Sequence, residues 1–516
     1  MSATRVVLAP SAPVASRRFG EEVDLVLTDG GAGDLHERLA RVPELRLVVD
    51  ARWRDPDRQL ARWRDLFLHL ADGGTWMVLC GPGNDGAVLE RLRELAAQGD
   101  GRGLGRRWAE PARAIADIRA GDRRVTVTKR GHHLVKTRDA DVDRVLAARA
   151  PDVAVTELAS FGPAVLTPHP ASTSHGDDGS VDLHGDLAAP AAHLRRYEGR
   201  LHLVEGSVVL HPASHTLLPD TYRWHLQDVP VNKRLVDVDA HVARTRRPEP
   251  VHEHLPGSYY YLDYKNPGHY GHLMTEAVSR LWGWRAAKQA DPDLKLLLRR
   301  TEKHDHGRRR PDLPLLAALG IAQEDVAWMD HSVSVDSLVG VTPLWHNKEP
   351  YSAHPAIRDL WSDLRTGLPT TTVEPAPRIF VTRAATGHRA CHDLAEVEQL
   401  FRGLGFTVVQ PGAMSVPEQA ALFAQARVVA GFGGTGMFNL AFARDVEQVV
   451  VLAHTAYDAR NEHLMAAVHG VPVHYLWSEP DVPHPEGAWS YEAFQSPWTF
   501  GVDRHRATLA RLLGGA

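Results

Sequence analysis

Short apolar runs alternate with amphipathic segments along most of this chain, and the alternation is clearest toward the C-terminus. Apolar runs typical of buried strands are separated there by stretches with helical periodicity. The predicted strands are 378–382, 406–410, 427–431, 448–452 and 471–476. The predicted helices are 394–404, 436–443 and 460–468, with another that begins at Ser415 and has Glu418 at the capping-box spacing. Four or more successive strand–helix units predict a doubly wound parallel sheet.

The N-terminal part shows the same alternation, with apolar runs at 5–9, 24–28, 45–49 and 76–80. A parallel sheet with helices on its faces is therefore expected over residues 1–120. The next part, 121–235, has short strand-like pieces separated by Pro, Gly, Ser and His, and it includes the polar stretch HPASTSHGDDGS at 169–180. This composition predicts a small, irregular, β-rich module with an exposed loop.

Residues 236–368 open with an aromatic run at 258–262, followed by Asn266 and Pro267. Asn is a good N-cap and Pro suits the first helical position, so a helix is expected to begin here. Further strands are expected at 294–298, 326–329 and 338–342, and the stretch GLPTTTVEPAP at 367–377 is typical of a linker. The predicted organisation is an N-terminal α/β domain (1–120), a β-rich module (121–235) and two Rossmann-like lobes (236–368 and 369–516).

Composition narrows the possible functions of this architecture. The 516 residues include 59 basic and 64 acidic side chains, for a net charge of −5. A nucleic-acid-binding protein is normally strongly basic, so no nucleic-acid partner is expected. No apolar run approaches the roughly 20 residues of a membrane span, and the N-terminus lacks a secretory apolar region. We therefore expect a cytoplasmic protein, and two cysteines are too few for a disulfide framework.

A glycine-rich segment, Gly431-Phe-Gly433-Gly434-Thr435-Gly436, lies between a predicted strand and a predicted helix. Glycines let the backbone approach a ligand closely, and a helix N-terminus offers N–H groups to phosphate. The alternative is a tight turn that needs positive φ. The spacing satisfies G-x-G-x-x-G, but the next strand ends without an acidic residue for a ribose. The segment is interpreted as a phosphate loop rather than a dinucleotide site.

Two arginines stand beside the same predicted sheet edge. Arg383 directly follows the strand at 378–382, and Arg389 lies in the loop beyond it. Guanidinium groups there can neutralise the phosphates of the same ligand. The alternative is that both are solvated loop arginines.

The helix after Asn266 carries His269, His272 and Glu276. His272 and Glu276 are four residues apart and share a face, with His269 one turn earlier on that side. A carboxylate beside an imidazole is a suitable general base. The same residues could instead form a metal site, although no fourth ligand is identifiable, or a polar helix face in water.

The N-terminal segment LRLVVDARWRDPDRQLARWRDLFLHLADGGTWMVLCGPG contains a strand ending in Asp50, a helix, Gly73-Gly74 and another strand. This order resembles the second half of class I S-adenosylmethionine-dependent methyltransferases. The glycines upstream, at 30, 31 and 33, do not complete the cofactor motif. The resemblance implies a degenerate methyltransferase-like domain without methyl transfer.

Residues 250–480 resemble glycosyltransferase family 61. The motifs are NPGHYGHLMTEAVSRLW, RIFVTRAATGHRACHDLAEVEQLF, FTVVQPGAMSVPEQAALFAQARVVAGFGGTGMFNLAFA and the strand QVVVL. The resemblance implies two lobes of GT-B type, a nucleotide-sugar donor, a glycan or glycoconjugate acceptor and inversion at the anomeric carbon. It implies no cofactor or metal, and a homo-oligomer is compatible with it. The implied acceptor-side residues are Asn266 and His269, with Glu276 or His272 as base. The implied donor residues are Arg383, Arg389, Glu418, Gly433, Gly434, Thr435, Gly436 and Asn439.

One position departs from the family pattern. Many members have His-Gly-Ala where this chain has Gly433-Gly434-Thr435, so the loop histidine is absent. The main hypothesis is an inverting glycosyltransferase of polysaccharide or glycoconjugate synthesis. Two alternatives are a catalytically silent scaffold that binds nucleotide or glycan, and a bifunctional methyltransferase–glycosyltransferase.

Overall fold

The computed structural model describes residues 4–9, 25–27, 32–52, 55–81, 85–99, 103–169, 172–173, 185–204, 207–247, 250–264, 267–300, 312–384 and 387–513. Asn266, the glycines at 30 and 31 and most of the predicted polar loop at 169–180 lie outside these residues. The chain divides into two compact units. The first comprises Met1–Thr156, Arg196–Ser258 and His331–Leu338, and the second comprises Glu157–Arg195, Tyr259–Asp330 and Val339–Ala516. The division into four regions stays a prediction.

The first unit begins with a mixed α/β sheet of order β2-β1-β3-β4-β6-β5. Its parallel strands are β1 (Thr4–Leu8), β2 (Leu25–Leu27), β3 (Leu45–Asp50) and β4 (Thr75–Leu79), and β6 (Arg124–Lys129) is antiparallel to β4 and β5 (Ile115–Gly121). The helices are α2 (Ala32–Ala40), α3 (Pro56–Leu66), η2 (Phe67–His69), α4 (Asp85–Ala97) and α5 (Arg106–Arg113). Alternate strand residues enter two separate apolar clusters, as period-2 strands in a covered sheet require. The predicted N-terminal α/β fold is confirmed.

The rest of the first unit is built from short strands around a small core. Its elements are β7 (Leu134–Lys136), α6 (Val142–Arg149), β13 (Val208–His211), β14 (Thr216–Leu217), η3 (Pro219–Thr221), β15 (Leu235–Asp237) and β16 (Val242–Thr245). β7 pairs in parallel with β14 and antiparallel with β16. The strands β8 (Ala154–Phe161), β12 (Ala192–Val204), β17 (Glu253–Tyr261) and β20 (Val333–Val341) contribute residues to both units.

The second unit contains a first parallel segment in which the end of β17 pairs with β18 (Lys295–Arg299), and β18 pairs with β19 (Val326–Met329). Its helices are α7 (Tyr270–His272), the π-helical turn η4 (Leu273–Ala277), the 3₁₀ segment η5 (Val278–Gly283), α8 (Trp284–Ala290), α10 (Asp312–Ala318), η6 (Gln323–Asp325) and α11 (Ile357–Gly367). Short antiparallel pairs join β9 (Ala164–Leu166) to β11 (Leu187–Ala189) and β21 (Trp345–His346) to β22 (Ser352–Ala353).

The predicted helix start at Asn266 and Pro267 is corrected by the structure. The helix begins at Tyr270, and His269 is its N-cap, with a ring nitrogen that accepts a hydrogen bond from the backbone N–H of His272. Gly268 has φ of 84°, and this left-handed conformation interrupts a right-handed helix. A helix that starts at Pro267 would have to pass through it.

A second parallel sheet forms the C-terminal part of this unit, in the order β10-β27-β26-β25-β23-β24. The strands are β10 (Ser172–Thr173), β23 (Arg378–Val381), β24 (Thr407–Val409), β25 (Val428–Phe432), β26 (Gln448–His454) and β27 (Val473–Ser478). Neighbouring strands in this order pair in parallel. The strands predicted after residue 377 are all present.

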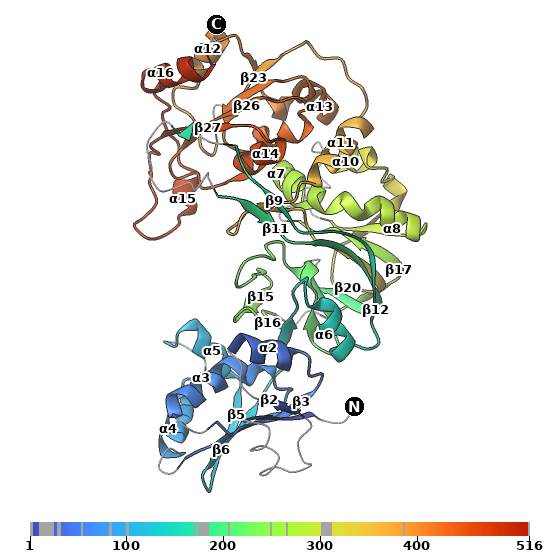
Figure 1. Cartoon of the computed structure of the whole chain (residues 1–516), viewed down its shortest axis with the longest axis vertical. Coiled ribbons are helices and arrows are strands. Elements are labelled where there is room, and N and C mark those ends of the chain that lie inside the picture. Colours follow the sequence, from blue (N-terminus) through green and yellow to red (C-terminus); the bar gives the residue numbers. More distant parts are fainter. Residues whose placement is uncertain are drawn as a thin grey trace. The chain divides into compact units, whose positions relative to one another are not determined.

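Helices cover both faces of this sheet, as doubly wound topology requires. They are η7 (Pro411–Ala413), α12 (Leu394–Gly403), α13 (Val416–Ala424), η8 (Thr435–Phe442), α14 (Asn461–His469), α15 (Tyr491–Phe494) and α16 (Val502–Leu513). On one face, Phe380 and Val450 pack with Phe401 of α12 and Leu509 of α16. On the other face, Val429 and neighbouring strand residues pack with α13, η8 and α14. Figure 1 shows α12 and α16 beside one another, near the C-terminus. The predicted helix at 436–443 is 3₁₀ rather than α.

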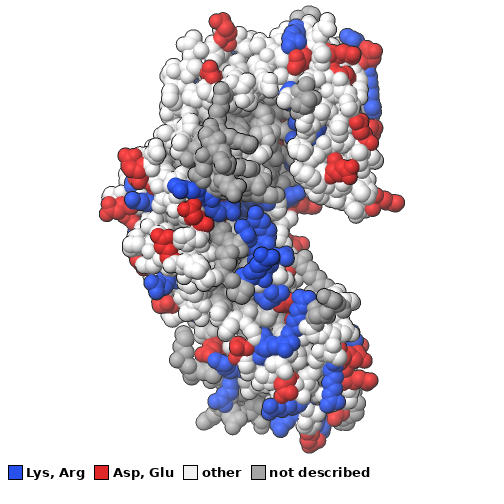
Figure 2. Space-filling view, turned by 180° about the vertical axis from the view of Figure 1, so that it is seen from behind, with Lys and Arg blue, Asp and Glu red and all other residues white. Residues whose placement is uncertain are grey.

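Charged side chains are unevenly spread on the surface. On the face shown in Figure 2, Lys and Arg side chains lie in groups, with Asp and Glu side chains between and around them. The near-zero net charge therefore conceals local concentrations of positive charge. Within the described residues, no helix is both long and apolar enough to span a bilayer.

Both cysteine thiols are expected to react slowly in the folded protein. Burial raises the pKa of Cys80 to about 11 and, together with the neighbouring Asp393 carboxylate, that of Cys391 to about 12. The reactive thiolate is then scarce at pH 8, so labelling with a thiol reagent should be on the order of 100-fold slower than in guanidinium. Rapid labelling of either cysteine in the native protein would contradict this expectation.

Candidate active site

A cavity of about 720 Å³ lies in the second unit, where β23 and β25 end. Residues after β23, residues before and within α13, and the first turns of η8 line it, together with Tyr270. The carboxyl ends of neighbouring parallel strands are the usual ligand position in an open α/β sheet. Its polar lining residues include Thr382, Arg383, Arg389, Gln410, Ser415, Gln419, Thr435 and Asn439.

The two predicted arginines converge on the glycine-rich segment 431–436, which we call the glycine loop. A Cβ placed on Gly434 would lie 3.0 Å from Arg389 Nη2 and 3.5 Å from Arg383 Nη2. Arg383 Nη1 donates to the carbonyl oxygen of Arg389 at 2.7 Å. Burial and the charge of Arg389 lower the pKa of Arg383 to about 10. Two neighbouring cations beside a cavity, without a carboxylate ion pair among the described residues, form a site that favours an anion.

Arg389 is held in an unusual conformation. Its φ is 57°, which is a left-handed value rarely adopted by residues other than glycine. Its guanidinium carbon lies 4.7 Å from the ring centre of Tyr457 and 5.2 Å from that of Phe494. Cation–π contacts of this kind fix the position of the charge without neutralising it. The arginine is therefore positioned before any ligand binds.

Close packing accounts for several glycines of the loop. A Cβ on Gly431 would lie 2.6 Å from Val381 Cβ, and one on Gly436 would lie 2.9 Å from Val381 Cγ1. Gly434 has φ of 140° and faces the arginines. Thr435, Gly436 and Asn439 line the cavity, whereas Gly433 and Gly434 do not. The predicted alternative, a turn that needs positive φ, therefore applies to Gly434, close packing accounts for Gly431 and Gly436, and the first turn of η8 remains available to a ligand.

The sequence did not reveal Glu462 as part of this site. This fully buried carboxylate of α14 accepts hydrogen bonds from the backbone N–H of Gly434 at 2.6 Å and from the hydroxyl of Tyr457 at 3.0 Å. Burial raises its pKa above the ordinary value. The Gly434 N–H therefore already has a hydrogen-bond acceptor, the Glu462 carboxylate. This bond holds the glycine loop in place next to Arg383 and Arg389. No sequence pattern signals this role, because it depends on contacts between distant segments.

The predicted His–Glu pair forms. His272 Nδ1 lies 2.7 Å from Glu276 Oε1, and the side chains are 26% and 8% exposed respectively. The π-helical turn η4 begins directly after His272 and includes Glu276. Such turns occur frequently at functional sites. The buried Glu276 carboxylate therefore orients the more exposed His272 imidazole. A general base is commonly held in position by a second side chain in this way.

The helix that carries this pair contacts the glycine-loop helix. Tyr270 OH donates to Asn439 Oδ1 at 2.5 Å, and a Cβ on Gly271 would lie 3.0 Å from Thr435 Oγ1. His272 follows one residue after Gly271, so the pair lies close to the cavity without lining it. His269 also does not line the cavity; its ring packs 4.9 Å from that of His272.

Glu418 is placed differently from the implied donor role. Its carboxylate accepts hydrogen bonds from the N–H and the hydroxyl of Ser415, both at 2.7 Å, in the predicted capping box. The adjacent Gln419 lines the cavity instead. The Glu-Gln pair therefore supplies one helix cap and one cavity residue.

In the N-terminal sheet, the strand-terminal Asp50 is engaged internally. Arg62 Nε and Nη2 donate to its two carboxylate oxygens at 2.9 and 3.2 Å, and Asp50 is fully buried. Both carboxylate oxygens therefore have a partner within the protein. Among the described residues of the whole chain, no three His, Cys, Asp or Glu side chains gather as a metal site requires.

The structure is an α/β fold with a cavity and two neighbouring arginines at the carboxyl edge of a parallel sheet. Residues 270–450 match the model of the family described as Glycosyltransferase 61, from the first residue of α7 into β26. This stretch of the chain is therefore similar to glycosyltransferase family 61, as the sequence motifs predicted, and the match supports a glycosyltransferase.

Comparison with curated proteins gives no match. Among solved structures, the MycE methyltransferase from the mycinamycin biosynthetic pathway in complex with Mg, SAH and mycinamycin VI is 17% identical with a TM-score of 0.19, and the match covers 25% of this chain and 42% of that one. Another structure of MycE, with Mg and SAH, is 15% identical with a TM-score of 0.19, over 25% of this chain and 36% of that one. The chain thus spans less than half the length of these methyltransferases.

Proposed function

We propose that this glycosyltransferase moves a sugar from a nucleotide-sugar donor to a hydroxyl of a glycan or glycoconjugate, with inversion at the anomeric carbon. The observation that carries the proposal is the convergence of Arg383 and Arg389 on the glycine loop, beside the 720 Å³ cavity. A nucleoside diphosphate supplies the negative charge that these guanidinium groups need. The first turn of η8 adds N–H groups that have no acceptor within the helix.

The reaction is a direct displacement. The acceptor oxygen forms a bond to C1 of the sugar while the bond from C1 to the phosphate oxygen breaks, and the nucleoside diphosphate leaves. Arg383 and Arg389 stabilise the charge that develops on the leaving phosphate, since they are positioned before the reaction starts.

We assign His272 as the group that takes the acceptor proton and Glu276 as the group that orients it. The carboxylate binds Nδ1, which leaves Nε2 as the ring nitrogen that can accept a proton. Glu276 is buried and already paired, whereas His272 is partly exposed. The acceptor would therefore lie on the α7 side, and Tyr270 and Asn439 would separate the two substrates' binding regions.

The proposal predicts activity that persists in EDTA. The arginine pair provides positive charge at the phosphates, so this role does not require a divalent ion. Nucleotide sugars of different bases are incubated with the full chain, with and without EDTA, and release of nucleoside diphosphate is measured. We expect one donor to be hydrolysed or transferred at a rate that chelation changes less than about twofold.

Loss of activity in EDTA that added metal restores would overturn the metal-independent mechanism. Saturable nucleotide binding without turnover of any donor would favour the scaffold alternative, which the absent loop histidine and the engaged Gly434 N–H motivate.

A further inference from the structure

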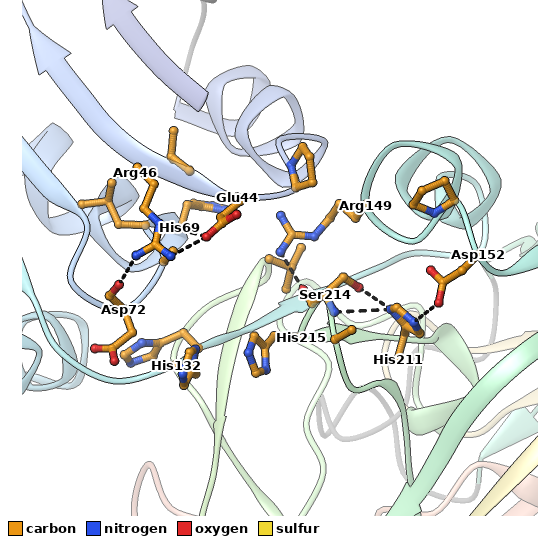
Figure 3. Close-up of a pocket in the computed structure, with 18 residues that line it drawn as sticks. Glu44, Arg46, His69, Asp72, His132, Arg149, Asp152, His211, Ser214 and His215 are labelled. Atoms are coloured by element: carbon orange, nitrogen blue, oxygen red, sulfur yellow. Dashed lines mark hydrogen bonds and ion pairs between the residues drawn. The ribbon is translucent and has the colours of Figure 1, made fainter. Parts of the chain in front are cut away.

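A second cavity, of about 470 Å³, lies within the first unit. Residues from the start of β3, the turn before β4, the segment between β6 and β7, the end of α6 and the β13–β14 turn line it (Figure 3). The β3 and β4 residues are at the amino ends of these parallel strands, opposite the carboxyl edge where α/β sheets usually bind ligands. We call it the histidine cavity, because its lining includes His69, His132, His133, His211 and His215.

Arg149, at the end of α6, is the main charge of the histidine cavity. It is 8% exposed, and it donates from Nε to Thr216 Oγ1 at 3.1 Å and from Nη2 to the Ser214 carbonyl at 2.8 Å. Nη1 donates to the carbonyl oxygens of Val42 and Ala40 at 2.5 and 3.5 Å. These four hydrogen bonds fix the orientation of the guanidinium. They leave one N–H of Nη2 that can donate to a ligand.

All of these acceptors are neutral, so the charge of Arg149 is not compensated. Within the described residues no carboxylate forms an ion pair with it, and burial alone lowers its pKa to about 10. A buried cation without a counter-ion is costly unless an anion binds beside it.

A buried polar atom in the same cavity also lacks a partner. His69 is 6% exposed and lines the cavity. Its Nε2 is hydrogen-bonded to His36 Nδ1 at 2.9 Å. Its Nδ1 has no hydrogen-bond partner in the described part of the chain. Buried polar groups almost always have a partner, so an unpaired one at a cavity indicates a missing ligand or water. This atom is the independent observation that the cavity is built to hold something polar.

Two more histidines extend the lining toward solvent. The rings of His132 and His215 stack at 4.3 Å between centres, and His215 has φ of 51° in the turn between β13 and β14. Gly or Asn is the usual residue at a left-handed turn position. A histidine there is strained, and strain of this kind is concentrated at functional sites.

The carboxylates of the cavity are at its rim and mostly engaged. Glu44 pairs with Arg46, Asp152 lies 3.2 Å from His211 Nε2, and Asp72 accepts from the Gly131 N–H at 2.7 Å. Asp72 and Asp152 are exposed, so water screens them, whereas Arg149 is buried. The deep end is therefore positive and the outer end neutral to negative.

We propose that the histidine cavity binds a phosphate-bearing small molecule at Arg149, beside the stacked His132 and His215. Its volume lies in the range of about 300–1,000 Å³ that small-molecule sites occupy, and it exceeds what a lone ion needs. A phosphate presents several oxygens in different directions, which matches donors that come from separate segments. This site is independent of the glycosyl-transfer site in the second unit.

The test uses the full chain with Arg383→Met and Arg389→Met, so that phosphates cannot bind the proposed donor site. Glucose 6-phosphate, inorganic phosphate and glucuronate are titrated by calorimetry at constant ionic strength. We expect one saturable site for glucose 6-phosphate, weaker binding of inorganic phosphate, and no binding of glucuronate, which carries a carboxylate at C6 where glucose 6-phosphate carries the phosphate.

Arg149→Met is expected to abolish binding, and His132→Ala to weaken it about tenfold, as for a lost charge-assisted hydrogen bond. His252→Ala is the matched control, because His252 is also exposed and contacts a second histidine, His331, in the same unit. If Arg149→Met does not fold, the double variant His132→Ala, His215→Ala decides. Absence of binding, equal binding of glucuronate, or binding that none of these cavity variants changes would overturn the proposal.

Discussion

Replacing Arg383 and Arg389 together by methionine is expected to weaken nucleoside diphosphate binding by at least about 100-fold. Each arginine would lose charge-assisted hydrogen bonds worth about 1.5–3 kcal/mol, or roughly 10- to 150-fold in affinity. Calorimetric titration of the nucleoside diphosphate into wild type and variant measures the change directly. Thermal shift gives a second reading, because the nucleotide should raise the Tm of the wild type but not of the variant.

Arg427→Met is the control for this pair. Arg427 is in the same unit, is exposed and is paired with Glu447. The Arg427→Met variant should therefore bind the nucleotide with the affinity of the wild type. Lysine at 383 and 389 should restore part of the affinity, since it keeps the charge but loses the planar geometry for two phosphate oxygens. Unchanged nucleotide affinity in the double methionine variant would place the donor elsewhere.

Glu276→Gln is expected to lower kcat by about 10²–10⁴-fold while leaving donor affinity unchanged. A glutamine amide can donate to His272 Nδ1, which places the ring proton on Nε2 and removes the nitrogen that accepts the acceptor's proton. Steady-state kinetics at saturating donor measures kcat, and nucleotide titration measures donor affinity.

His272→Ala should give a similar loss, and combining it with Glu276→Gln should add little, because the two side chains act as one unit. Glu396→Gln, an exposed substitution in the first turn of α12, controls for the loss of a carboxylate in the same unit. A Glu276→Gln enzyme with normal kcat would exclude the pair from proton transfer.

Local sequence signals predicted the parts of the site that follow strands directly. Arg383 and Arg389 follow β23, and the glycine loop begins in the last two residues of β25, so the neighbouring positions of these strands bring them together. The capping box of Ser415 and Glu418 was likewise predictable, because all its contacts lie within four residues.

Other features depended on tertiary contacts that no local pattern encodes. Glu462 reaches Gly434 across 28 residues, and Tyr270 reaches Asn439 across 169. Asn266 looked like an N-cap because of Pro267, but the positive φ of Gly268 moved the helix start to Tyr270. The histidine cavity was also missed, since its residues come from five separate segments of the chain.

Arg389 has a further consequence for anyone who engineers this protein. A left-handed backbone at a residue other than glycine costs on the order of 1–3 kcal/mol. A selection for heat resistance alone would therefore favour glycine at 389, since it adopts the observed φ of 57° without strain. The stabilised variants would lack the guanidinium that contacts the glycine loop. A substitution that raises stability at this position would therefore lower turnover.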